Sequence, residues 1–153
     1  MSDMIPLRSK DTVPFHCGRC AACCRNIKDT IMVEPIDAFR LARFFHGRSG
    51  YSQIRGVEGV YSWFTHISTL EGIFPIYLMN ATGPEGACTF LENGRCSVYE
   101  ARPRVCRLYP FTAFPGTRGR DFVFYQCMDG HAGHFSGGRA VVKDWMYENF
   151  TRE

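Results

Sequence analysis

Four of the eight cysteines in this chain fall within eight consecutive positions, in the run Cys17-x2-Cys20-x2-Cys23-Cys24. Thiolates three residues apart can curl a short loop around one metal centre, and the small residues between them let backbone N–H groups approach the sulfurs. Bacterial ferredoxins wrap the same C-x2-C-x2-C spacing around a 4Fe–4S cluster. Free cysteines also pack as small hydrophobic residues, but four so close together favour a metal site. The run therefore predicts metal binding.

The other four cysteines are spread over the second half of the chain, at Cys88, Cys96, Cys106 and Cys127. Cys88 and Cys96 flank an Asn-Gly pair, the dipeptide most typical of a tight β-hairpin, so we expect the hairpin arms to bring them close. The eight thiols divide equally well into two sets of four and into one cluster plus several structural thiols. We take all eight as candidate metal ligands.

Composition limits the class of protein and its setting. The 153 residues, 45% of them hydrophobic, suit one compact domain over residues 1–153, with residues 1–13 as a leader that packs late or stays mobile. There is no apolar run of about 18 residues for a membrane span and no apolar stretch typical of a secretory signal. A net charge of +3 is too small to indicate nucleic-acid binding. We therefore expect a cytoplasmic protein, where cysteine clusters hold metal more often than they form disulfides.

Local patterns predict a small α+β domain, with short antiparallel strands, a few helices and long loops around the cysteine-ligated metal. Pro35 opens a helix, since the N–H that proline lacks has no partner at the first helical position, and an apolar stripe then runs to about residue 46. The other expected helices cover residues 57–67, 101–108 and 139–150. The expected strands cover residues 30–33, 72–78, 88–91, 95–99 and 121–126.

The spacing also bears on which metal is bound. Structural zinc favours paired C-x2-C knuckles from two separated places, and the second half of the chain has no second knuckle. This favours iron–sulfur, with one or two 4Fe–4S clusters, over zinc. The matching function is electron transfer, or accessory and maturation work for a larger enzyme, with a protein as partner. The alternative is a zinc-stabilised protein-binding module with no redox role.

The second-half cysteines lie in a specific pattern. Cys88-Thr-Phe-Leu is followed by Cys96-Ser-Val-Tyr-Glu-Ala-Arg-Pro-Arg-Val-Cys106-Arg-Leu-Tyr-Pro-Phe. With the first run, this pattern resembles the YkgJ-type cysteine-cluster family over about residues 15–127. The resemblance implies chelation of zinc or iron. The family also includes a flagellin lysine N-methylase, which implies an iron–sulfur cluster with methyl transfer. We do not carry the methylase activity over, because the chain is short and shows no glycine-rich nucleotide loop, and cluster-dependent methyl transfer stays a weaker alternative.

Two arginines and two histidines are further candidates. Arg102 and Arg107 lie inside the motif, where their charge would offset the thiolates and tune a bound cluster; the other interpretation is an ordinary solvated surface. His131 and His134 follow Cys127 as Cys-x3-His-x2-His. Imidazoles are good zinc ligands, but no partner pattern supports ligation, and we favour a polar, glycine-rich loop.

Overall fold

The computed structural model describes residues 4–116, 122–127 and 135–150. Four α-helices and short antiparallel strands confirm the predicted α+β class. The chain forms two compact units, each with its own core. The central unit is Ala21–Cys106, and the terminal unit joins Met1–Cys20 to Arg107–Glu153.

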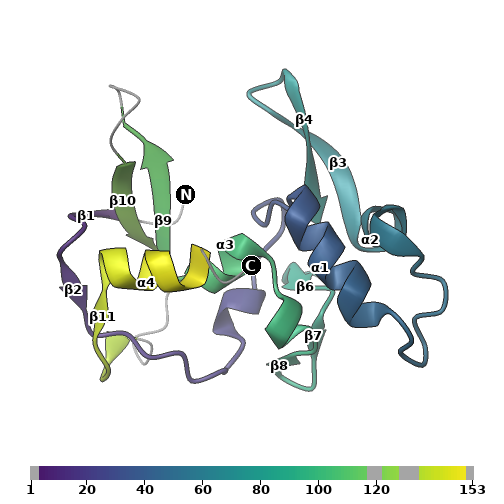
Figure 1. The fold of residues 1–153 in the computed structure, drawn as a ribbon, viewed down its shortest axis with the longest axis horizontal. Helices are drawn as coiled ribbons and strands as arrows, with labels where there is room; N and C mark the ends of the chain where they lie inside the picture. The colour runs from purple at the N-terminus through teal and green to yellow at the C-terminus, as the bar shows by residue number, and fades with distance from the viewer. Residues whose placement is uncertain (1–3, 117–121, 128–134, 151–153) are drawn as a thin grey trace. The chain divides into compact units, whose positions relative to one another are not determined.

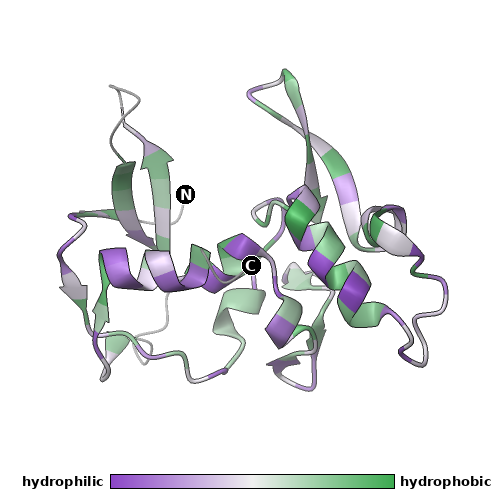
Figure 2. Cartoon of the chain, in the orientation of Figure 1, coloured by the Kyte–Doolittle hydropathy of each residue, from purple (hydrophilic) through white to green (hydrophobic). Residues whose placement is uncertain are grey.

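Two helices dominate the central unit (Figure 1). Helix α1 covers Pro35–Phe45 and begins at Pro35, as predicted. A capping box between Glu34 and Asp37 satisfies the first free backbone N–H groups of this helix. Figure 2 shows hydrophilic and hydrophobic residues side by side along α1, and its buried positions include Ala38, Leu41 and Phe45. Helix α2, Gly56–Phe64, adds the buried Val60.

The expected helix over residues 57–67 is wrong at its end, because the chain turns into a strand at Thr65. The Thr65 hydroxyl donates to the carbonyl of Tyr61 at 2.7 Å, which satisfies one of the last free helix carbonyls. Strand β3, Thr65–Leu70, then pairs antiparallel with β4, Phe74–Met79, from Thr65↔Met79 to Leu70↔Phe74. The expected strand over residues 30–33 is reduced to one bridge, Met32↔Leu78.

Short elements complete the central unit. The 3-10 helix η1 covers Ala22–Cys24, and strand β5, Ala81–Thr82, pairs with β6, Ala87–Cys88. The Asn-Gly hairpin joins β7, Leu91–Glu92, to β8, Arg95–Cys96. Cys88 therefore lies in the β5–β6 pair and not on an arm of this hairpin, which corrects the prediction. The 3-10 helix η2, Tyr99–Ala101, and α3, Arg104–Leu108, follow; α3 starts directly after Pro103, as a proline-restricted first turn requires.

The core of the central unit is aromatic. Phe45 stacks on Tyr51 with ring centroids 4.4 Å apart and also contacts Phe64 and Phe90. The buried cluster around them includes Ile27, Val33, Leu41, Val60, Met79 and Val98. This core packs against Cys88 and Cys96.

The terminal unit combines both ends of the chain. Strands β1 (Met4–Leu7), β10 (Phe122–Cys127) and β9 (Phe111–Pro115) form an antiparallel sheet in the order β1-β10-β9. Strand β2, Thr12–Val13, pairs with β11, Ala140–Val141, which leads into helix α4, Val142–Phe150. The segment expected to be a leader thus supplies two strands. The core around Phe15 includes Val13, Leu108, Phe111, Val142 and Met146. No helix in the described parts of the chain is long and apolar enough to cross a membrane.

Candidate metal centre

Five of the eight cysteines belong to the central unit. Cys23 and Cys24 lie on η1, Cys88 ends β6, Cys96 ends β8, and Cys106 lies on α3. All five are partly buried and none is in a disulfide. Thiols from three segments of this unit, far apart in the sequence, therefore meet in one region.

Three of these thiols share hydrogen bonds. The Cys24 thiol hydrogen-bonds with Cys23 and with Cys96, and this lowers the pKa of Cys23 to about 7 and the pKa of Cys96 to about 7. The same hydrogen bonds raise the pKa of Cys24 far above its usual range. Cys23 and Cys96 are thus the thiols in this group that most readily become thiolates, the form that binds metal.

The other two thiols are more deeply placed. Burial raises the pKa of Cys88 to about 11, and nearby negative charge on Cys96 and Cys23 adds to the effect. Burial also raises the pKa of Cys106, which feels the charges of Cys88, Cys23 and Cys96. Every pair among Cys23, Cys88, Cys96 and Cys106 consequently interacts. Such a group resists collecting negative charge unless a cation compensates it.

Two matched turns present Cys88 and Cys96. The N–H of Phe90 donates to the Cys88 sulfur at 3.5 Å, and the N–H of Val98, also two residues on, hydrogen-bonds with the Cys96 sulfur. The turns are joined, because both the N–H and the hydroxyl of Ser97 donate to the carbonyl of Phe90, at 2.9 and 3.1 Å. Backbone N–H groups aimed at sulfur stabilise the thiolate form.

Of the two candidate arginines, Arg102 lies near the thiols. Its guanidinium lies over the Tyr99 ring, 3.8 Å from the centroid, and donates to the Tyr99 carbonyl at 3.3 Å. Its charge contributes to the lowered pKa of both Cys23 and Cys96, after the larger effect of the Cys24 hydrogen bonds. Arg107 belongs to the terminal unit, where it is buried and donates to the Asn149 carbonyl at 2.9 Å.

The structure adds Asp37, which sequence reasoning used only as part of a resemblance. Asp37 is 1% exposed. One carboxylate oxygen accepts the N–H of Glu34 at 3.2 Å and the other accepts the N–H of Arg104 at 2.8 Å. Asp37 thereby connects the start of α1 to the start of α3, two residues before Cys106. The Glu-x-x-Asp spacing before an apolar stripe was the available signal, because it resembles a capping box.

The remaining cysteines, Cys17, Cys20 and Cys127, belong to the terminal unit. Cys17 and Cys20 are exposed, and the N–H of Cys127 donates to the Pro110 carbonyl at 2.8 Å. The predicted run of four cysteines is thus divided between the two units, after Cys20. His131 and His134 lie outside the described residues.

No set of three or more His, Cys, Asp and Glu side chains is arranged as a ready metal site within residues 4–116, 122–127 and 135–150. The central thiols gather by hydrogen bonds to one another. The donor set nevertheless fits zinc or iron, because soft thiolates select these metals. Binding an ion therefore requires the thiols to lose their protons and turn toward it.

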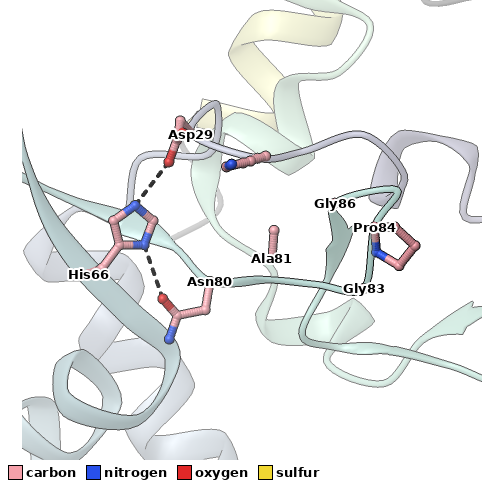
Figure 3. Close-up of a pocket in the computed structure, with 8 residues that line it drawn as sticks. Asp29, His66, Asn80, Ala81, Gly83, Pro84 and Gly86 are labelled. Carbon is pink, nitrogen blue, oxygen red and sulfur yellow. Dashed lines mark hydrogen bonds and ion pairs between the residues drawn. The ribbon is translucent and has the colours of Figure 1, made fainter.

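A separate polar pocket of about 450 Å³ lies in the central unit, away from the cysteines (Figure 3). His66 spans it, with Nε2 3.0 Å from an Asp29 carboxylate oxygen and Nδ1 3.0 Å from the Asn80 side-chain oxygen. Both ring nitrogens are thus engaged, so the histidine has no nitrogen left to coordinate a metal.

Comparison with known proteins supports the metal assignment. A family model named CxxCxxCC and described as "Putative zinc- or iron-chelating domain" matches residues 16–131. This range contains all eight cysteines. No match was found among curated proteins or among solved structures.

Proposed function

The chain belongs to the CxxCxxCC family of zinc- or iron-chelating domains, and on that premise we propose that its central unit binds one metal ion through Cys23, Cys88, Cys96 and Cys106. The observation that carries this assignment is that every pair of these four thiols interacts. Cys24 interacts with Cys23 and Cys96, and we assign it outside the ligand set as a hydrogen-bond donor to these sulfurs.

Zinc is the metal that the sulfur spacing supports best. Tetrahedral Zn–S bonds of about 2.3 Å hold the four sulfurs about 3.8 Å apart. Hydrogen-bonded sulfurs such as those of Cys24 and Cys96 already stand at contact distance. The matched turns at Cys88 and Cys96 supply, in three dimensions, the second knuckle that the sequence spacing lacks.

The function that follows is a zinc-stabilised protein-binding module. Bound zinc would supply folding free energy and would need no redox chemistry. The chain's own residues hold the site: the Phe90 and Val98 amides orient two sulfurs, Asp37 anchors the segment before Cys106, and Arg102 offsets the negative charge. The ion would cross-link η1, the β6–β8 region and α3, segments with few strand pairs of their own.

Elemental analysis of the full chain, purified without oxygen, tests this proposal. We expect one zinc per central unit and no acid-labile sulfide. Cys88→Ser and Cys106→Ser should each remove one equivalent of metal, whereas Cys24→Ser, the matched neighbour, should retain it. A folded wild-type chain free of metal would overturn the proposal, and so would full retention of metal in Cys88→Ser.

An iron–sulfur protein is the second candidate. The observation in its favour is the C-x2-C-x2-C spacing of Cys17, Cys20 and Cys23, which is the ferredoxin spacing. In that case one or two 4Fe–4S clusters would serve electron transfer or the maturation of a larger partner enzyme, and Arg102 would raise the reduction potential.

The same preparation separates the two candidates. Iron and sulfide in equal amounts, with a brown colour that bleaches on reduction, would support the cluster. In that case Cys17→Ser and Cys20→Ser should lose the colour together with Cys23→Ser. For a zinc centre in the central unit, Cys17→Ser should leave the zinc equivalent of that unit unchanged.

A further inference from the structure

The β3–β4 hairpin exposes an unusual amount of apolar side chain. Ile67 is 68% exposed, Ile73 72%, Phe74 61% and Leu70 52%, and Trp63 at the end of α2 is 58% exposed. Figure 1 shows the hairpin projecting beyond α1 and α2. Glu71 is the only acidic or basic residue, apart from His66, in positions 65–79. Two strands alone are marginally stable in water, so a surface of this kind calls for a cover.

The two edges of the hairpin differ. The base of β4 is already covered, because the N–H of Val33 donates to Tyr77 and the N–H of Met79 donates to Ile31. Further out, β4 carries Pro75, which has no N–H to extend a ladder. Strand β3 pairs only with β4 among the described strands and contains no proline, lysine or arginine. Charges and prolines are the usual protections of a free edge, and β3 has neither.

We propose that two copies of this chain pair through β3, antiparallel about a two-fold axis, in a four-stranded sheet of order β4-β3-β3-β4. A two-fold interface brings the same surface against itself, so a charged strand would repel its copy. The segment Thr-His-Ile-Ser-Thr-Leu has no fixed charge, and its β-branched residues suit cross-strand packing.

The size of the surface fits a dimer. The five exposed apolar side chains offer roughly 600 Å² per copy, since aromatic residues alone present 150–250 Å² when fully exposed. The backbone of β3 adds to this area. A stable interface needs about 800 Å² per partner, whereas an isolated patch of this size is rare on a monomer.

Sedimentation velocity of the metal-loaded full chain over a range of concentrations tests the dimer. We expect a concentration-dependent dimer for the wild type. Ile67→Lys places a charge on each copy at the shared edge and should raise the dimer dissociation constant by roughly tenfold or more. The matched control is Phe122→Lys in β10, a strand residue that is 64% exposed, and it should leave the dissociation constant unchanged.

Hydrogen exchange supplies an independent readout. Amides of β3 should exchange more slowly at dimeric concentrations than after dilution, and Ile67→Lys should remove this difference. A wild-type chain that stays monomeric at submillimolar concentration would overturn the proposal. A dimer that Phe122→Lys dissociates and Ile67→Lys does not would overturn it as well, because the interface would then lie in the terminal unit.

Discussion

Asp37 is the residue through which α1 and the segment before Cys106 depend on one another. Its buried carboxylate accepts two backbone N–H groups, from Glu34 and Arg104. Asp37→Ala would leave both donors without this acceptor inside the protein, so we expect a loss of about 2–4 kcal/mol in the free energy of unfolding, measured with denaturant. Glu34→Gln removes only a partly exposed ion pair with Arg104 and should cost less than about 1 kcal/mol. Equal losses in the two variants would contradict this role for Asp37.

Gly138 is the residue that lets the terminal unit close around Phe15. Its φ is +73°, and an added Cβ would stand 2.6 Å from the Phe15 carbonyl oxygen and 3.0 Å from the His16 Cβ. Gly138→Ala therefore combines left-handed strain with a backbone clash, and we expect it to lower stability by about 2 kcal/mol or more. Gly18, with nothing within 4 Å of its Cβ position, is the matched control, and Gly18→Ala should be close to neutral. Thermal unfolding of both variants provides the comparison, and a harmless Gly138→Ala would show that this backbone moves freely.

At the scale of elements, α1 illustrates a helix held by one face. Phe45 is 1% exposed among the rings of the central core, whereas Phe39 on the same helix is 48% exposed. Phe45→Ala should cost about 3–5 kcal/mol because it opens a cavity between Tyr51, Phe64 and Phe90. Phe39→Ala removes an exposed ring and should stay within about 1 kcal/mol. Urea denaturation monitored by circular dichroism measures both, and a similar cost for the two would mean that the burial pattern of α1 is wrong.

Elements with a local cause were predictable from the sequence. The start of α1 follows from Pro35, and the β7–β8 hairpin follows from its Asn-Gly turn. The end of α2 was not predictable, because the preference of Thr65 for a strand depends on β4 lying opposite it. Cys88 was misplaced for the same reason: its partner strand, β5, is two residues long and has no signal of its own.

At the scale of the whole molecule, metal binding was predictable and the grouping of ligands was not. Thiol count and spacing indicated a metal, and the family match agrees. However, the division of the cysteine run after Cys20 arises because Ala21–Cys106 builds one core and the two chain ends build another. That division depends on contacts such as Phe15 with Trp145, ring centroids 5.3 Å apart, which join residues from opposite ends of the sequence.

Removing the metal should therefore affect the two units differently. If an ion cross-links the thiols of the central unit, a chelator should lower the melting temperature of that unit, since a ligand bound only to the folded state stabilises it. The terminal unit, held by the aromatic core around Phe15, should lose less. Hydrogen exchange resolved along the sequence, with and without chelator, would measure this as faster exchange in residues 87–106 than in residues 4–13. Cys88→Ser is the control, because a chain that has already lost the ion should respond little to the chelator. Equal acceleration in both segments would contradict a centre confined to the central unit and would instead indicate that metal supports both cores.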